Sequence, residues 1–342
     1  MRAIRIHEHG DLSVLRIDEI PQPTPKENEV LVKIKAVAMN HMDLWVRQGM
    51  PGVKLPLPII LGCEASGIVE SSGSSAKKFK KGDEVVIIPN RSCGECPACR
   101  EGNDHFCPQF GLYGETEDGL EVEYKSVPEK NLLLKPKALS FEEAAAIPVT
   151  FLTAWHMLID KCQLQKEETV LVVAASSGVG SAAVQIAKHF GAQVIATAGS
   201  EDKIQHAREL GADHVINHTT QDFSKEVKKL TNGKGVDIVF EHVGAVTWEK
   251  SMRSLGFRGR LVTCGATTGP EVKINLVHLF IKHQRILGST MGPSRALSDI
   301  YQLAADKKIH PVIDHTYSFD QVKEAHRRLE GRGQFGKIVL IP

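Results

Sequence analysis

The sequence lacks an excess of charge of either sign. Its 342 residues contain 42 Lys and Arg against 41 Asp and Glu, which gives a formal net charge of +1. This balance provides no large electrostatic field to hold nucleic acid or an anionic membrane. We therefore expect neither of them as a partner, and a small-molecule substrate is favoured.

A long uninterrupted hydrophobic run is also missing. Residues 1–8 are broken by charge and contain no apolar core of a secretory signal. The longest apolar stretch, Ala144 to Leu158, includes Pro148 and His156 and is too short to span a membrane. We expect a cytoplasmic protein. The 42% hydrophobic and 24% charged residues are typical of a folded chain, and the length predicts two domains.

Cysteine is sparse except in one short stretch. Four of the seven cysteines, Cys93, Cys96, Cys99 and Cys107, have the spacing C-x2-C-x2-C-x7-C. In a cytosolic chain this pattern favours metal binding over disulfides. Four thiolates close a tetrahedron around Zn²⁺ without an open position for water, so we predict one structural zinc in a lobe at about residues 91–110. An iron–sulfur cluster is the alternative, but ferredoxin-type runs place three residues before the last Cys, where this chain has seven.

The sequence pattern changes between the two halves of the chain. Up to about residue 145 it predicts short strands in a β-rich barrel, as at 30–37 and 83–89. From about residue 169 strands alternate with amphipathic helices, which requires a parallel sheet covered by helices on both faces. The expected strands are 170–174, 193–198, 214–217, 236–243, 260–265 and 286–290, and the expected helices are 179–190, 201–210, 223–230 and 297–305. A last strand at 337–341 is expected to return to the first domain.

A dinucleotide site is predicted where the strand at 170–174 meets the next helix. The turn Ala175-x-Ser177-x-x-Gly180 consists of small residues that let the backbone approach a pyrophosphate, and the helix start favours its charge. The alternative is a tight turn without a ligand, because the usual G-x-G-x-x-G pattern is degraded here.

The end of the second strand of this series indicates which cofactor is bound. Residues 196–200 contain no carboxylate where NAD-binding proteins hold the ribose hydroxyls, whereas Ser200 and Lys203 suit a 2′-phosphate. Glu201 and Asp202 follow directly and, if turned inward, favour NAD instead. We predict NADPH, with NADH as the alternative.

These features together resemble the medium-chain dehydrogenase/reductase superfamily. The matching pieces are residues 61–70, 81–85, the cysteine lobe, 175–180 and 335–340. The resemblance implies an α/β protein with a GroES-like β-barrel catalytic domain from residues 1–150 and 291–342, and a doubly wound Rossmann domain from 151–290. It also implies a homodimer or homotetramer. The cofactor contacts that it implies are His41, Thr153, Ser177, Gly178, Val179, Ser200, Lys203, His218, Val243, Gly265, Ala266, Ser289, Thr290 and Lys337.

The resemblance also shows where this chain departs from zinc alcohol dehydrogenases. At the three positions of their catalytic zinc ligands it has Asn40, Cys63 and Val149, so one ligand of three remains. A site rebuilt from Cys63 with His41 or Glu64 is the alternative. The pattern Asn40-x-x-Asp43-x-Trp45-x-Arg47-x-Gly49 instead resembles the quinone oxidoreductase branch, which uses no active-site metal.

We therefore predict hydride transfer from NAD(P)H to an activated acceptor, a quinone or an α,β-unsaturated carbonyl, without catalytic zinc. Asn40 is the candidate for holding the acceptor oxygen or the nicotinamide ribose, with Asp43 and Glu64 orienting it. Alternatively, Asn40 is a buried amide satisfied by backbone, and Asp43 fixes its own loop. Two other functions stay open, a zinc-dependent alcohol dehydrogenase and a cofactor-binding protein without turnover.

Overall fold

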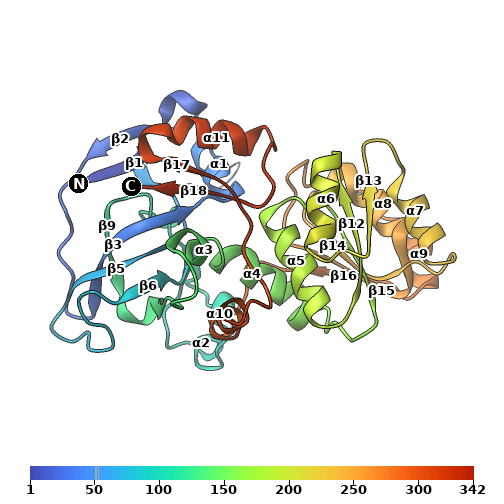
Figure 1. Cartoon of the computed structure of the whole chain (residues 1–342), viewed down its shortest axis with the longest axis horizontal. Coiled ribbons are helices and arrows are strands. Elements are labelled where there is room, and N and C mark those ends of the chain that lie inside the picture. Colours follow the sequence, from blue (N-terminus) through green and yellow to red (C-terminus); the bar gives the residue numbers. More distant parts are fainter. Residues whose placement is uncertain (51, 53) are drawn as a thin grey trace. The chain divides into compact units, whose positions relative to one another are not determined.

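The computed structural model describes residues 1–50, 52 and 54–342, which form two folded units. Unit 1 contains Met1–Val149, Pro293–Lys307 and Pro311–Pro342, and unit 2 contains Thr150–Gly292 and Lys308–His310 (Figure 1). The short piece 308–310 belongs to unit 2 because the Gln185 side chain holds the backbone of His310. Gln185 Nε2 donates to His310 O, and His310 N donates to Gln185 Oε1, both at 2.8 Å.

Unit 1 is built on a mixed sheet that both ends of the chain share, in which β17 and β18 pair in parallel and the other neighbours are antiparallel. In the described part of the chain its order is β10 (Leu132–Leu134), β6 (Glu84–Ile87), β5 (Glu64–Ser72), β3 (Glu29–Ala38), β18 (Lys337–Ile341) and β17 (Ile313–Ser318), and β9 (Tyr124–Pro128) also pairs with β3. Strand β18 pairs antiparallel with β3, with Val339 opposite Ala38. The predicted return of the last strand to the first domain is therefore confirmed.

Smaller sheets and short helices complete this unit. Strands β2 (Arg16–Glu19), β1 (Arg2–Ile6) and β4 (Ile59–Ile60) form one small sheet, and β7 (Asn90–Arg91) pairs with β8 (Gly111–Leu112). The helices are α1 (His41–Gln48), α2 (Pro97–Arg100), α3 (Phe141–Ala145), α10 (Leu297–Ala305) and α11 (Val322–Glu330). Helix α4 (Pro148–Trp155) begins in unit 1 and continues into unit 2. The larger apolar core of this unit, which includes Ile34, Leu61 and Leu340, packs against the sheet, and a smaller one joins Ala38, Ala145 and Val339.

Unit 2 is a parallel sheet covered by helices (Figure 1). The strand order in the described residues is β13 (His214–Asn217), β12 (Gln193–Ala198), β11 (Thr169–Val172), β14 (Val236–Glu241), β15 (Leu255–Thr263) and β16 (Arg285–Gly288). The helices are α5 (Gly178–His189), α6 (Glu201–Glu209), α7 (Phe223–Leu230), α8 (Ala245–Ser254) and α9 (Leu276–Ile281). The order reverses between β11 and β14, which confirms the predicted doubly wound fold.

The structure contains two helices of unit 2, α8 and α9, that the sequence patterns did not predict. Five of the six residues of α9 are apolar, so its sequence has no polar face opposite an apolar one, and none of the six is buried. No helix in the described residues combines the length and apolar character that crossing a membrane requires.

Candidate active site and metal centre

Asn40 lies at the centre of a group of polar side chains between β3, β5 and β18. Its amide Nδ2 donates to Glu64 Oε1 at 2.9 Å, and also lies 3.3 Å from both Ala38 O and Cys63 Sγ. Its Oδ1 accepts from Lys337 Nζ at 2.7 Å. We refer to Asn40, Cys63, Glu64 and Lys337 as the Asn40 cluster. Both amide hydrogens of Asn40 have acceptors within the protein.

Lys337 and Glu64 form a buried ion pair in this cluster. Lys337 Nζ lies 2.7 Å from Glu64 Oε1, and the side chains are 5% and 0% exposed. Besides Glu64, the ammonium donates to Asn40 Oδ1 and to the carbonyl of Met39, so three acceptors face its three N–H groups. The sequence assigned Lys337 to the cofactor, but the structure places its ammonium against Glu64 and Asn40.

The second carboxylate oxygen of Glu64 faces the start of helix α4. Glu64 Oε2 accepts from the backbone N–H of Val149 at 2.6 Å. A negative charge is favourable at this position, because the first N–H groups of a helix have no partner inside it. Val149 occupies one of the three family positions for a zinc ligand, and it contributes its N–H here instead of a side chain.

Asp43 connects the loop before α1 with the loop before β5. Its Oδ2 accepts from Asn40 N at 2.7 Å, and its Oδ1 accepts from Gly62 N at 3.2 Å. Burial, the largest effect, raises the pKa of Asp43 to about 6, and the Glu64 charge adds to it, whereas the two N–H donors and Lys337 oppose the rise. Asp43 therefore orients the backbone on both sides of the Asn40 cluster.

Cys63 in this cluster, and His41 beside it, stay uncharged at neutral pH. Burial first, and then the charges of Arg332 and Lys337, lowers the pKa of His41 to about 4. Burial also raises the pKa of the Cys63 thiol well above its ordinary value, and the charges of Asp43 and Glu64 contribute. His41 is therefore a neutral imidazole and Cys63 a protonated thiol at neutral pH.

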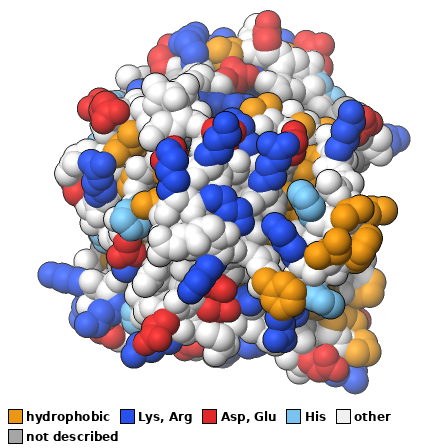
Figure 2. All heavy atoms as spheres, turned by 90° about the vertical axis from the view of Figure 1, so that its right-hand side faces the viewer, with side chains coloured by type: hydrophobic (Ala, Val, Ile, Leu, Met, Phe, Trp, Pro, Cys, Tyr) orange, Lys and Arg blue, Asp and Glu red, His pale blue; other side chains and the backbone are white. Residues whose placement is uncertain are grey.

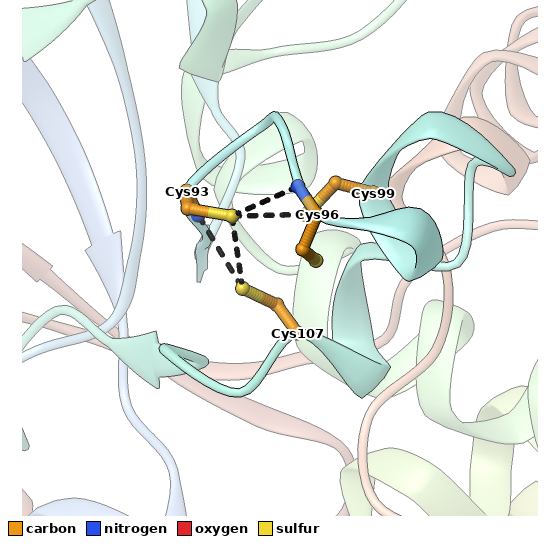
Figure 3. A group of neighbouring side chains, drawn as sticks. All are labelled: Cys93, Cys96, Cys99 and Cys107. Atoms are coloured by element: carbon orange, nitrogen blue, oxygen red, sulfur yellow. Dashed lines mark hydrogen bonds between the residues drawn. The ribbon is translucent and has the colours of Figure 1, made fainter.

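The four clustered cysteines converge as the spacing predicts (Figure 3). Their sulfur atoms all lie within 4.8 Å of one another, with Cys93 Sγ at 3.5 Å from Cys107 Sγ and 3.9 Å from Cys99 Sγ. A tetrahedral zinc with Zn–S bonds of ~2.3 Å requires sulfur atoms ~3.8 Å apart, so the donor set fits this ion. Within the described residues, this is the one set of three or more His, Cys, Asp or Glu ligand atoms that could share an ion. His41, Cys63 and Glu64 do not form such a set.

Backbone N–H groups face the sulfur atoms as well. Cys93 Sγ accepts from Cys96 N at 3.3 Å and from Glu95 N at 3.5 Å, and Cys107 Sγ accepts from Gln109 N at 3.3 Å. The N–H groups of Glu95 and Cys96 are the largest influences that lower the pKa of Cys93, to about 6. Such donors favour thiolates, which are the forms that bind a metal.

The predicted dinucleotide turn is tight and leads directly into helix α5. Ala174 adopts a positive φ of 54°, which is uncommon for a residue other than Gly. Ser177 is the N-cap of α5, and its Oγ accepts from Gly180 N at 2.9 Å. A Cβ at position 180 would lie 2.4 Å from Ala174 O, so only Gly fits there. The first N–H groups of α5, those of Gly178 and Val179, belong to the free donors at a helix start.

A histidine and two lysines, His218, Lys203 and Lys250, lie near the ends of β12 and β13. The imidazole of His218 lies over the turn at Gly199, where an added Cβ would be 3.2 Å from His218 Nε2. Burial first, and then the positive charges of Lys250 and Lys203, lowers the pKa of His218. Glu201, the competing carboxylate, accepts from Asn217 Nδ2 at 3.3 Å. Lys250 was not among the residues predicted from the sequence, because it lies on α8, far from this turn along the chain.

The other predicted cofactor residues of unit 2 follow the ends of its strands. Val243 comes after β14, Gly265 and Ala266 after β15, and Ser289 and Thr290 after β16. The carboxyl ends of parallel strands share one edge of the sheet, where doubly wound folds bind their ligands. Thr153 lies on α4, with its Oγ1 3.8 Å from Met291 Sδ.

Comparisons with known proteins agree with this architecture. Residues 26–137 match the alcohol dehydrogenase GroES-like domain, and residues 178–333 match the zinc-binding dehydrogenase family. A crystal structure of an NAD-dependent alcohol dehydrogenase superposes with a TM-score of 0.97 at 47% identity over 100% of both chains. Human quinone oxidoreductase is 31% identical over 100% of this chain and 98% of its own length. Acryloyl-coenzyme A reductase of Sulfurisphaera tokodaii is 31% identical over 96% of each.

The chain therefore belongs to the medium-chain dehydrogenase/reductase superfamily. Within it, the protein is an oxidoreductase that uses a nicotinamide cofactor and acts on a small-molecule substrate.

Proposed function

We propose that this protein transfers hydride from NADPH to a quinone or an α,β-unsaturated carbonyl without a catalytic zinc. The observation that carries the proposal is the Lys337 ammonium bound between Asn40 and Glu64. Two of the three family positions for zinc ligands bear Asn40 and Val149, neither of which offers a side chain that zinc prefers. An acceptor that is already electron-poor needs no Lewis acid to polarise it.

In this proposal Asn40, Asp43 and Glu64 of unit 1 position other groups of the site and do not react themselves. A bound reduced nicotinamide supplies the hydride. Because both amide hydrogens of Asn40 have acceptors in the protein, we assign Asn40 to fixing the Lys337–Glu64 pair in preference to holding the acceptor oxygen. Glu64 fixes the start of α4, and Asp43 fixes the backbone of Asn40 and Gly62. By holding the backbone around the site in one position, these contacts keep the acceptor in a fixed orientation for hydride transfer.

The preference for NADPH rests on the residues at the ends of β12 and β13. Lys203 and Lys250 provide positive charge for a phosphomonoester, His218 offers a ring nitrogen as a hydrogen-bond donor, and the side chain of Glu201 accepts a hydrogen bond from Asn217. Titration of the protein with both cofactors, followed by nicotinamide fluorescence, tests this proposal. We expect NADPH to bind at least tenfold more tightly, and Lys203→Ala to weaken NADPH with little change for NADH. Tighter binding of NADH by the unaltered protein would refute it.

A panel of substrates tests the reaction. We expect NADPH oxidation with 1,4-quinones and with 2-enones, and little NAD(P)⁺ reduction with primary or secondary alcohols. The relatives named above are a quinone oxidoreductase, a reductase of an α,β-unsaturated thioester and an alcohol dehydrogenase. The panel therefore tests which of these three activities the protein has. Alcohol oxidation as the dominant activity would favour a zinc-dependent alcohol dehydrogenase. Binding of NADPH without turnover on any member would favour a protein without catalysis.

Cys93, Cys96, Cys99 and Cys107 would hold one zinc as a structural ion, because four thiolates leave no position for a substrate. The seven cysteines form no disulfide within the described chain. Free thiols in this number are typical of a reducing compartment, and the proposal includes the cytoplasm as the location.

An exposed apolar surface on unit 2 supports the predicted oligomer. Leu276, Val277, Phe280 and Ile281 of α9 are 51–66% exposed, and the neighbouring strand β16 pairs only with β15 among the described strands. Hydrophobic side chains gather along one edge of this face of the molecule (Figure 2). A second copy placed along β16 would cover both features. Sedimentation of the unaltered protein and of a Phe280→Glu variant tests this part of the proposal, with a dimer expected for the first and a monomer for the second.

A further inference from the structure

Three side chains, two from β5 and one from α10, hold the segment that runs from α3 into the start of α4, which we call the 141–149 segment. Ser66 Oγ of β5 donates to Phe141 O at 2.6 Å, and Tyr301 OH of α10 donates to Ala144 O at 2.8 Å. At the other end, Val149 N donates to Glu64 Oε2 at 2.6 Å. The position of Glu64 therefore depends on the position of this segment.

The hydrogen bond from Tyr301 supplies a donor to a backbone carbonyl that would otherwise have none. The carbonyl of Ala144 would normally accept from the residue four positions later in a helix, but that residue is Pro148, which has no N–H. Ala144 is fully buried, so water does not replace the missing donor. Tyr301 is 4% exposed. Burial first, and then the Glu64 charge, raises the pKa of its phenol well above the ordinary value, so the hydroxyl keeps the proton that it donates.

The beginning of α10 is held by the cysteine lobe. Asp104, in the short 3₁₀ helix Asp104–Phe106 just before Cys107, accepts from Ser294 N at 2.8 Å and from Ser294 Oγ at 2.5 Å. The next residue, Arg295, donates from Nε to Gly102 O at 3.2 Å. Ser294 and Arg295 form the 3₁₀ turn Ser294–Ala296, which continues directly into α10. The lobe therefore fixes the helix that carries Tyr301.

We propose that Tyr301 is a positioning residue for Glu64, and that the metal-loaded cysteine lobe keeps Tyr301 in place through Asp104 and Ser294. The inference rests on the proposed function only in that Glu64 orients the active site. Loss of the Tyr301 hydroxyl, or of the metal, would release the 141–149 segment and with it the bond between Val149 and Glu64. The proposed structural zinc would then help to keep Glu64 in position, in addition to ordering its own loop.

Hydrogen–deuterium exchange of the full-length, zinc-loaded protein tests the inference without any substrate. In Tyr301→Phe we expect the amides of residues 144–149 to exchange about fivefold faster, the effect of losing one hydrogen bond. Asp104→Asn and removal of zinc should increase exchange in the same peptide. Peptides from β12 in unit 2 serve as the internal reference and should not change. Tyr113→Phe is the matched control, because Tyr113 is also a buried tyrosine of unit 1 but makes no hydrogen bond to the 141–149 segment.

The possible outcomes separate the two parts of the inference. Unchanged exchange of residues 144–149 in Tyr301→Phe, or an equal increase throughout the molecule, would overturn the role of Tyr301. An increase confined to residues 91–110 after zinc removal would overturn the role of the lobe. If Tyr301→Phe also lowers kcat with an unchanged KM for NADPH, the proposed reaction and the inference are both supported. Faster exchange in a protein without activity on quinones or enones would support the inference and refute the proposed function.

Discussion

Replacement of Glu121 by methionine should stabilise the protein. Glu121 is 0% exposed, and among the described residues neither of its carboxyl oxygens has a hydrogen-bond partner. Its Cγ packs against Gly62, where an added Cβ would lie 2.8 Å away. Methionine fills a similar volume without a polar group, so Glu121→Met keeps this packing and removes the buried carboxyl.

The expected gain in the free energy of unfolding equals the cost of burying a polar group without a hydrogen-bond partner, which is ~1–3 kcal/mol. For a domain of this size each kcal/mol raises Tm by roughly 2–4 °C, so we expect an increase of about 2–12 °C. Burial is the largest cause that raises the pKa of Glu121 well above its ordinary value of 4.5, and the charge of Asp43 adds to it. The unfolded chain therefore loses this proton at lower pH than the folded protein does, and the folded protein loses stability as pH rises above 4.5. The advantage of Glu121→Met should be small at pH 4 and larger at pH 8.

Urea denaturation and thermal melting at several pH values measure this difference. Glu123→Met is the matched control, because Glu123 lies two residues further along, is partly exposed and binds Arg2 through its side chain. Its pKa is lowered, chiefly by the N–H of Arg2, so its removal should destabilise the protein near neutral pH. A Glu121→Met variant that is less stable than the unaltered protein at pH 8, or whose advantage does not grow with pH, would refute the reasoning.

Other substitutions test the Asn40 cluster and the metal site. Lys337→Met leaves the Glu64 charge buried without a partner and should destabilise the protein by ~3–5 kcal/mol in urea denaturation, with part of the loss recovered in the double variant with Glu64→Gln. Because the pKa of Asp43 is raised to about 6, kcat should fall as pH drops through 6 and Asp43 loses its charge, and a pH profile of Asp43→Asn should lack this step. Cys107→Ser should bind less zinc than one ion per chain and melt at a lower temperature, and full zinc occupancy in this variant would contradict the ligand set.

Much of the fold follows from local sequence patterns. Strand β12, helix α7 and strand β18 have the predicted bounds within one or two residues, because their hydrophobic spacing reflects which face is buried. The four cysteines could be assigned to one site because a metal imposes a short and regular spacing on its ligands. Helix α9 was missed because it has only six residues, five of them apolar, and so shows no alternation between an apolar and a polar face.

The candidate site could be predicted only in part. Asn40, Asp43 and Glu64 were found from their positions in family motifs, and the structure brings Asn40 and Glu64 into contact with each other. The pairing of Lys337 with Glu64 joins residues at opposite ends of the chain, and no local pattern encodes such a contact. Tyr301 was missed for the same reason, although the absence of an N–H at Pro148 is a signal that Ala144 needs a donor from elsewhere.

The central claim is that the reaction needs no zinc at Asn40, Cys63 and Val149. The most direct test is the zinc content per chain of protein purified without chelator, measured together with its activity on quinones, enones and alcohols. The account predicts one zinc per chain, lost in Cys107→Ser, and NADPH-dependent reduction of an activated acceptor. Two zinc ions per chain, with one retained in Cys107→Ser and alcohol oxidation as the main activity, would contradict it.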